Sequence, residues 1–593
     1  MTWIERKVQN PDLVQQLSHV LNDLPLPLAR ALVLRGIDSF ETARTYFRAT
    51  LEETHDPWLL QTMEEAASRL ARAIQSQERV LVYGDFDVDG VTSTTLVVDF
   101  LRSRGTQVDY FIPSRLEDGH GFHERGVKTA LAQNATLIVV VDCGTSATET
   151  AALARKHRLD IIICDHHENT GVNPPSVAHI NPKRNGCTYP FKELSACGLA
   201  YKMAVSTCEL LNEPPETTRE YLDLVALSTV CDVMPLHDEN RILVREGLEV
   251  LRSTTRYSLQ ALMNVAGVEP SEIRSNDIAM RLGPHLNAAG RLAHAGLAVE
   301  LLLEKNFEQA FQLAFQLGEL NTKRKGLGKE IETTASKLAR TQLAGAHPHA
   351  LVLHDPEWHP GVLGPVANRI VEAFGRPTIL LTNDPQDQRD AETRSGLVVG
   401  SARSVEGLDI HDALASCRDL LTKFGGHAQA AGLSIPAVDI PVLRERLNAY
   451  VRTRIDTRFV VTSTGYDAKL AATDINQRFV NVLKQCEPFG KNNEEPLFCI
   501  PDLHVVSVRT TRTGEHLSLT FKAPGKGRQL DAIAFWHGDK LIAMEEARIQ
   551  QLPVELLCRV TENTFNGRTR LQLRVEALRT ADIPSSPNNT CQA

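Results

Sequence analysis

Acidic residues and histidines follow three apolar runs in the first third of the sequence. The runs cover residues 80–83, 137–141 and 161–164. The polar residues that come after them are Asp85, Asp87, Asp89, Asp142, Asp165, His166 and His167. Carboxylates and imidazoles bind divalent cations and carry protons in hydrolytic reactions. These residue types in this pattern favour hydrolysis at a metal centre.

Repulsion among so many carboxylates sets a physical condition on such a site. Carboxylates that converge without compensation have raised pKa values or are pushed apart. Mn²⁺ or Mg²⁺ suits a site made of carboxylates with one or two imidazoles. Two such ions about 4 Å apart can activate a water molecule and stabilise the leaving oxygen in phosphoryl hydrolysis. A later helical stretch, VALSTVCDVMPL, offers one more acid, Asp232.

Each fragment also has a simpler explanation when it is taken alone. The DxDxDG pattern also fits a calcium-type loop or a solvated acidic turn. A single Asp after an apolar strand, such as Asp142 or Asp165, is commonly a helix N-cap. Paired histidines are more often structural. Because the fragments occur together at successive strand ends, the metal site is the better interpretation of the whole set.

The elements that must position these residues are strands of a parallel sheet. Residues 80–83, 137–141 and 161–164 are continuously apolar, and 108–112 is apolar except for Asp109, as in strands buried in an α/β sheet. Parallel strands end at the same edge, where α/β proteins place their sites. We therefore expect the acids and imidazoles to meet at one rim.

The remaining chain predicts a multidomain α/β protein. Residues 305–345 predict one long helix, or two if Gly326 and Gly328 interrupt it. Alternating apolar residues after 456 predict a small antiparallel barrel, with a hairpin turn at Asn566–Gly567. The expected regions are 1–75 (helical), 76–304 (parallel-sheet domain), 305–345 (connecting helix), 346–455 (second α/β domain), 456–580 (β-barrel) and 581–593 (disordered tail).

Composition narrows the class of protein. The 593 residues carry a formal net charge of −9, which argues against coating DNA through bulk positive charge. No run of about 18 apolar residues occurs, and the first residues lack an apolar leader, so we expect no membrane span and no export. The eleven cysteines form no CxxC pair and are expected to be reduced thiols of a cytoplasmic protein.

Four motifs resemble those of the DHH phosphoesterase superfamily: YGDFDVDGVTST, VVVDCGTS, ICDHHE and STVCDVMPL. Further stretches, such as RLGPHLNAAGRL and KFGGHAQAAGLSI, are similar to the RecJ exonuclease family within it. The resemblance implies a DHH domain, a DHH-associated domain and a C-terminal OB-fold barrel. It implies a 5′→3′ exonuclease specific for single-stranded DNA that acts in DNA repair and recombination. Implied partners are single-stranded DNA, a single-strand-binding protein and a helicase, for a monomeric enzyme.

The resemblance also implies roles for the motif residues. Two divalent ions, Mn²⁺ or Mg²⁺, would be held by Asp85, Asp87, Asp89, Asp142, His166 and Asp232. Asp142 would bridge the ions and His166 would be the ligand imidazole. His167 would lie beside the scissile phosphate or orient Asp142. Asp165 would fix its neighbours.

Candidate DNA contacts lie in the two later domains and around the metal site. Arg403 follows a glycine-started turn and could grip a phosphate with two hydrogen bonds, and glycine pairs let backbone amides approach an anion. The candidates are Arg115, Asn287, Arg291, Arg369, Ser401, Arg403, Ser404, Gly425, Gly426 and His427, and in the barrel Lys522, Lys526 and Arg528. Trp536 could stack on bases, whereas Phe521 and Phe535 are expected in the core.

Three positions depart from the family pattern, and two other functions stay open. His285, His120 and Asn492 stand where the family usually has Arg, Tyr and Gly. We expect none of them to touch a metal ligand, so they bear on DNA contacts. One alternative is a phosphodiesterase for short oligonucleotides or cyclic dinucleotides. The other is an inactive DNA-binding scaffold, which usually lacks metal ligands, whereas none is missing here.

Overall fold

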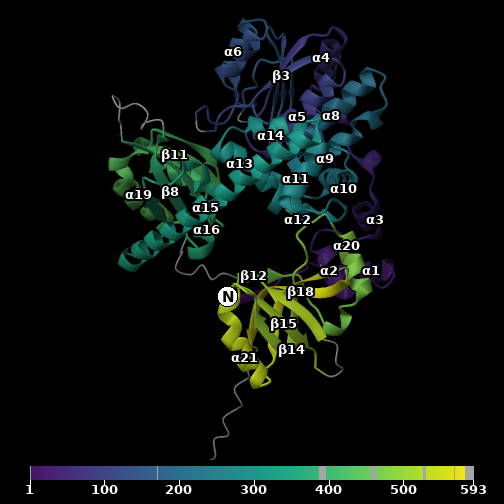
Figure 1. The fold of residues 1–593 in the computed structure, drawn as a ribbon, viewed down its shortest axis with the longest axis vertical. Coiled ribbons are helices and arrows are strands. Elements are labelled where there is room, and N and C mark those ends of the chain that lie inside the picture. The colour runs from purple at the N-terminus through teal and green to yellow at the C-terminus, as the bar shows by residue number, and fades with distance from the viewer. Residues whose placement is uncertain are drawn as a thin grey trace, which may run out of the picture. The chain divides into compact units, whose positions relative to one another are not determined.

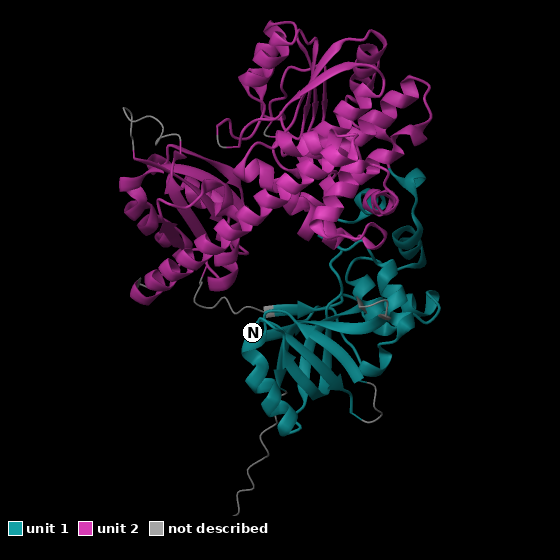
Figure 2. Cartoon of the chain, in the orientation of Figure 1, with its two compact units in different colours: residues 1–54, 235–242, 463–593 teal, residues 55–234, 243–462 magenta. Residues whose placement is uncertain are grey.

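A computed structural model describes residues 2–115, 117–169, 171–346, 348–385, 396–455, 463–524, 529–565 and 568–580. The chain forms two compact units (Figure 2). The barrel unit comprises Met1–Thr54, Pro235–Ile242 and Ser463–Ala593, and the two-sheet unit comprises His55–Met234 and Leu243–Thr462. The expected helical region 1–75 is therefore divided between the units. Among the helices of the described ranges, none combines the length and the apolarity that a bilayer crossing needs.

The first sheet of the two-sheet unit is parallel throughout, as predicted. Its strands are β2 (Arg79–Tyr83), β3 (Gln107–Phe111), β4 (Leu137–Val141), β5 (Asp160–Cys164) and β6 (Ala178–Ile180). The order is β3-β2-β4-β5-β6, so β2, β4 and β5 are neighbours. The short strand β6 was not predicted, because its central residue is polar His179 and three residues make no apolar run.

Helices cover both faces of this sheet (Figure 1). On one face, α6 (Glu124–Ala132) and α7 (Thr148–Lys156) share a core with Tyr83 and Ile163. Among the other helices of this part, α5 packs against both α8 and α9, and α4 packs against α8. Their bounds are α4 (Met63–Gln75), α5 (Val88–Arg102), α8 (Ala196–Leu210), α9 (Leu222–Cys231), α10 (Asp238–Arg252), α11 (Tyr257–Ala266), α13 (Gly283–Leu292) and α14 (Gly296–Leu303).

The long helix α15 (Phe307–Ala346) runs without interruption for 40 residues. The alternative of two helices broken at Gly326 and Gly328 is therefore wrong. A glycine inside a helix costs only about 1 kcal/mol, and buried residues such as Leu317 and Ala335 anchor the helix on both sides of the pair. A Cβ at Gly328 would lie 3.0 Å from Arg369 Nη2, so this glycine makes room for a side chain of the second domain.

The second sheet is mixed. Its order is β10-β11-β9-β8-β7, and only β7 and β8 pair in parallel. The elements are β7 (Leu351–His354), α16 (Leu363–Phe374), β8 (Thr378–Asn383), β9 (Leu397–Arg403), α18 (Ile410–Ala415), β10 (Lys423–His427), β11 (Ala430–Pro436) and α19 (Ile440–Arg452). The helices α18 and α19 share one core with β8, β9 and β11.

The barrel unit contains a closed sheet. Its order is β13-β14-β15-β16-β18-β17, and an additional β14–β17 pairing closes it. The strands are β13 (Ala468–Lys469), β14 (Phe498–Thr510), β15 (Leu517–Lys522), β16 (Gln529–Ala534), β17 (Val554–Phe565) and β18 (Arg568–Thr580). Because β16 and β18 pair in parallel, the expectation of a purely antiparallel barrel is wrong. The predicted alternation in β15 is confirmed, since Leu517, Leu519 and Phe521 are buried.

The N-terminal helices complete the barrel unit. The helices α1 (Asp12–Val20), α2 (Leu26–Val33) and α3 (Phe40–Arg48) share a core with the barrel and with α20 (Gln477–Gln485) and α21 (Leu541–Ile549). At the edge, β1 (Thr2–Glu5) pairs in parallel with β12 (Ser463–Tyr466). Phe535, expected in the core, is 45% exposed, and Trp536 is 72% exposed. Lys526, Arg528, Asn566–Gly567 and 581–593 lie outside the described residues.

Candidate active site

The loops after β2, β4 and β5 bring the predicted acids and imidazoles together. Three sets have ligand atoms that all lie within 4.8 Å of one another. The sets are Asp85, Asp87 and Asp142; Asp89, His166 and Asp232; and Asp142, His166 and His167. Asp232, the C-cap of α9, reaches the same place from a helix. Asp142 belongs to two sets, as a residue between two ion positions would.

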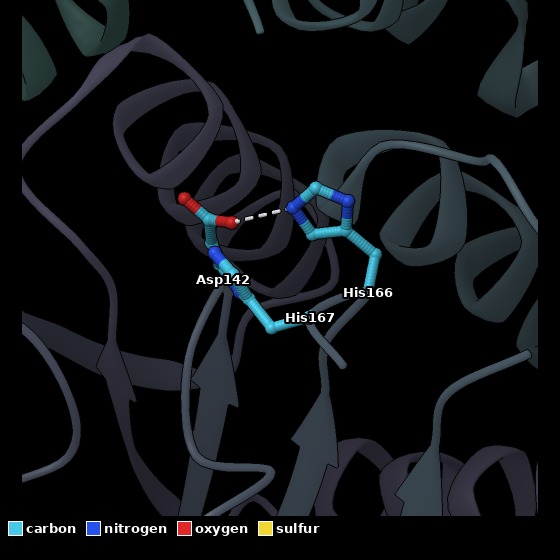
Figure 3. A group of neighbouring side chains, drawn as sticks. All are labelled: Asp142, His166 and His167. Atoms are coloured by element: carbon cyan, nitrogen blue, oxygen red, sulfur yellow. Dashed lines mark ion pairs between the residues drawn. The ribbon is translucent and has the colours of Figure 1, made fainter. Parts of the chain in front are cut away.

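His166 lies at the centre of the cluster. Its Nε2 is 3.3 Å from Asp142 Oδ1, 3.6 Å from Asp89 Oδ2 and 3.6 Å from Asp232 Oδ2. Figure 3 shows the ring directed at the Asp142 carboxylate. Within the described residues, both ring nitrogens of His166 and Asp85 Oδ1 are buried without a hydrogen-bond partner. Buried polar atoms are normally paired, so these atoms fit a cation as the missing partner.

The electrostatics of the cluster favour the same ligand. Burial, followed by repulsion from Asp89, Asp87, Asp85 and Asp232, holds the pKa of Asp142 well above its ordinary value. Burial also lowers the pKa of His166 and keeps it neutral, the form in which imidazole binds metals. A pair of divalent cations would remove the repulsion and leave the carboxylates ionised.

Asp89 is fixed by the N-terminus of α8. Its Oδ2 accepts from the Ala196 N–H at 2.8 Å, and its Oδ1 accepts from the Cys197 N–H at 2.9 Å. Ser228 on α9 donates its hydroxyl to Oδ1 at 2.7 Å. The positive end of the α8 dipole stabilises this carboxylate. Asp89 therefore links α5, α8 and α9 at the point where Asp232 leaves α9.

The second carboxylate of this region, Asp165, organises the histidine loop. Its Oδ1 accepts from the N–H groups of His166 and His167 and from His167 Nδ1 at 2.7 Å, and its Oδ2 accepts from the Thr145 N–H. Burial alone would raise the pKa of Asp165, but the hydrogen bond and charge of His167 bring it below the ordinary value. Burial by itself would lower the pKa of His167. The hydrogen bond to Asp165 and the charge of that carboxylate outweigh this effect and raise the pKa to about 9. His167 is thus a protonated, half-exposed group beside the cluster.

Arginines from distant elements gather next to the acids. Burial, together with the charges of Arg115, Arg324 and Arg403, lowers the pKa of Arg291 to about 10, although Asp87 acts in the opposite direction. Arg403 donates to Ser401 Oγ at 2.9 Å. Like charges this close favour an anionic ligand between them. The structure therefore brings Arg115, Arg291, Ser401 and Arg403 together, and adds Arg324.

Arg324 was missed because a basic residue on a long polar helix gives no signal in the sequence. It lines a cavity of about 200 Å³ together with Asn287 and Arg291. The apolar side of this cavity includes Val233, whose φ of 56° is a conformation that β-branched residues rarely adopt. Such strain next to Asp232 is typical of functional sites.

The other residues that we expected to contact DNA lie elsewhere in the second domain and in the barrel unit. Arg369 pairs with Glu332 at 2.8 Å, and the buried Ser404 hydroxyl donates to the Leu408 carbonyl, which is a structural contact. Gly425, Gly426 and His427 form exposed residues of the edge strand β10. Lys522 ends β15 in the barrel unit.

The three departures can now be placed. We expected that none would touch a candidate metal ligand, but His120 does, because its Nδ1 lies 3.1 Å from Asp85 Oδ2. The loop before α6 brings it there, and its ring packs on Phe86. His285 donates to the Arg281 carbonyl at 2.6 Å. Asn492 has a φ of 60°, which Asn tolerates better than most side chains, and this explains how it stands in place of Gly.

Comparisons with known proteins match three family domains along the chain. The chain matches the DHH family N-terminal domain over residues 79–229, the DHHA1 domain over 347–453 and the RecJ OB domain over 466–577. It is 34% identical to the single-stranded-DNA-specific exonuclease RecJ of Bacillus subtilis, over 97% of this chain and 70% of that protein. Identity to the protein of the same name from Escherichia coli is 34%, over 93% of this chain and 96% of that protein.

Two solved structures of a RecJ protein are similar in fold to this chain. The crystal structure of RecJ from Thermus thermophilus in complex with Mn²⁺ superposes with a TM-score of 0.80 at 28% identity, covering 98% of this chain and 80% of that one. The structure of that protein with Mg²⁺ gives a TM-score of 0.74 at 27% identity, covering 98% and 79%.

Proposed function

The chain belongs to the RecJ family of single-stranded-DNA-specific exonucleases, and from this premise we propose that it removes nucleotides stepwise from single-stranded DNA. The observation that carries the proposal is the position of His166 Nε2, within 3.6 Å of carboxylate oxygens from three separate segments. The reaction is phosphodiester hydrolysis that depends on Mn²⁺ or Mg²⁺. It serves DNA repair and recombination.

We propose that two ions share the cluster. Asp85, Asp87 and Asp142 would hold the first, and Asp89, Asp142, His166 and Asp232 the second. Bound there, the ions supply an activated water and charge stabilisation for the leaving oxygen. Such binding takes deprotonated carboxylates and a neutral imidazole, and burial favours the neutral ring of His166.

The other side chains act on the strand. Asp165 holds His167 by Nδ1 and leaves Nε2 for the substrate, so we propose that this nitrogen faces a phosphate oxygen of the strand. The guanidinium groups of Arg115, Arg291 and Arg403 bind the phosphate next to the scissile one. A terminal phosphate held in this cluster would define the end at which the enzyme starts, which we propose is the 5′ end.

We further propose the biological setting. A cytoplasmic enzyme is supported by the cysteines, all of which are free in the part of the chain that the structure describes. Free single strands are short-lived, so a helicase that opens the duplex and a single-strand-binding protein are the partners expected for a monomeric nuclease.

End-labelled oligonucleotides test the proposal. Digestion of a 5′-labelled and a 3′-labelled single strand, with Mn²⁺, Mg²⁺ or EDTA, reports metal dependence and polarity together. Asp142→Ala should abolish release while the protein stays folded. Asp412→Ala is a control for the loss of an aspartate elsewhere, because Asp412 is exposed and belongs to a separate group with Asp409 and His411 in the second sheet domain. Release that persists in EDTA, or that starts from the 3′ label, would contradict the proposal.

A further inference from the structure

A buried polar network lies behind the histidine loop, and no role described above uses it. It consists of Asn181, directly after β6, His179 in β6, and Thr145 in the loop after β4. All three residues are at most 2% exposed. Buried polar side chains are normally hydrogen-bonded. Among the described residues His179 Nδ1 has no partner, but the other side-chain polar atoms of the network are paired, and their partners indicate what it holds.

Asn181 joins two loops of the site. Its Nδ2 donates to Thr145 Oγ1 at 2.9 Å and to the His167 carbonyl at 2.9 Å, and its Oδ1 accepts from the Lys183 N–H at 2.8 Å. The Thr145 N–H in turn donates to Asp165 Oδ2. Hydrogen bonds from the Asn181 amide and from the Thr145 N–H therefore connect the loop that follows Asp142 to the loop that carries Asp165, His166 and His167.

One hydroxyl lies between the Asn181 amide and the His179 ring. An amide nitrogen only donates, so Thr145 Oγ1 accepts from Asn181 at 2.9 Å. The same oxygen is hydrogen-bonded to His179 Nε2, at 3.1 Å. Burial lowers the pKa of His179 to about 4, so this ring is neutral at pH 7. The Thr145 hydroxyl is thus held by two buried side chains at the end of β6.

We propose that Asn181, acting with Thr145, is a positioning residue that sets the geometry of the Asp165-His166-His167 loop relative to Asp142. It touches neither ions nor substrate. Its amide connects the loops that follow β4 and β5, and it holds the His167 carbonyl at the point where the loop turns away from β5. The inference rests on the metal site proposed above.

The test compares Asn181→Ala with Asn493→Ala. Asn493, in the barrel unit, is similarly buried and also makes three hydrogen bonds: Nδ2 donates to the carbonyls of Cys486 and Pro488, and Oδ1 accepts from the Tyr46 hydroxyl. Mn²⁺ binding is measured by electron paramagnetic resonance and calorimetry, turnover on a single-stranded oligonucleotide, and melting by circular dichroism. Asn181→Ala should weaken the Mn²⁺ site that includes His166 about tenfold and lower kcat about tenfold. Asn493→Ala should lower the melting temperature alone.

A second pair covers the case in which Asn181→Ala folds poorly. Thr145→Val removes the hydroxyl with little change of shape, and Thr145→Ser keeps it. Thr145→Val should reproduce the loss of Mn²⁺ affinity, Thr145→Ser should restore it, and the double variant with Asn181→Ala should be no worse than the worse single. Wild-type Mn²⁺ affinity and kcat in Asn181→Ala and Thr145→Val would overturn the inference. A wild-type protein that binds no Mn²⁺ would instead overturn the proposed function.

Discussion

At the level of single residues, Asp142 and Asp165 form an instructive pair. Both carboxylates are almost fully buried at the same edge of the sheet. Asp142 faces other acids, and burial with their repulsion raises its pKa. Asp165 faces N–H groups and the His167 ring, which lower its pKa against the effect of burial. A bound cation would stabilise the Asp142 carboxylate, whereas Asp165 already has hydrogen-bond donors and the His167 ring beside it.

This difference predicts opposite responses of the metal-free protein to neutralisation. A raised folded-state pKa gives stability only at low pH, which is lost as pH rises through that pKa, whereas a lowered one gives stability above the unfolded-state pKa. At pH 7 in EDTA, Asp142→Asn should therefore raise the melting temperature and Asp165→Asn should lower it. With Mn²⁺ present, Asp142→Asn should melt below wild type. Equal shifts of both variants in EDTA would contradict the assignment.

His120 gives a second prediction, on the ion held by Asp85. His120→Phe keeps the ring packing on Phe86 and removes the nitrogen that contacts Asp85. The His120 side chain is 67% exposed, so water can replace it, and the loss should be small. We expect about threefold weaker Mn²⁺ affinity in titrations, below the range for buried partners of ligands. The exposed His157→Phe serves as control, and a loss above a hundredfold would instead make His120 a direct ligand.

At the level of elements, the helices that carry ligands are joined at their far ends. Asp89 lies in the first turn of α5 and Asp99 in its last turns, whereas α9 begins beside Asp223 and ends at Asp232. Arg256 lies between them, with Nε 3.0 Å from Asp223 and Nη1 3.4 Å from Asp99. The guanidinium thus fixes the helix pair at the end opposite to the metal cluster.

Loss of this arginine should cost much of the stability. Arg256→Met keeps most of the volume and leaves the buried Asp223 carboxylate without its cationic partner, and breaking a buried pair costs about 3–5 kcal/mol. Urea unfolding measures the change, and the double variant with Asp223→Asn should recover part of it. Because Lys305 still pairs with Asp99 when Arg256 is replaced, the informative comparison is the stability that the double variant with Asp223→Asn regains over Arg256→Met. A loss below about 1 kcal/mol would mean that the pair is solvated.

The sequence correctly predicted those strands and helices that a local pattern of residues determines. The runs 137–141 and 161–164 became β4 and β5 because a short, continuously apolar run identifies a buried strand. Gly90 could not be anticipated in the same way. Its absent Cβ would lie 2.4 Å from the Asp85 carbonyl, so glycine is needed where the aspartate loop turns into α5. The contact of His120 with Asp85 was missed because it depends on the course of a loop.

At the level of the whole molecule, the sequence pattern does not predict which distant segments of the chain pack against each other. The apolar faces of α1 and α2 predict that these helices are buried but not against which partner. The structure packs Leu17 and Leu28 into the core that contains Phe479 and Phe498, from the opposite end of the chain. The barrel unit is therefore assembled from both ends of the chain, and the two-sheet unit holds every candidate metal ligand.

That division predicts two separable responses to metal. A ligand that binds only the folded state stabilises it by about 2.7 kcal/mol at a hundredfold excess over Kd. Mn²⁺ should thus raise the melting transition of the two-sheet unit and leave that of the barrel unit unchanged in differential scanning calorimetry. Asp142→Ala should abolish the shift, and Asn493→Ala should lower the other transition only. If Mn²⁺ moves both transitions equally, or moves a single common one, then the cluster is not confined to one independently folding unit.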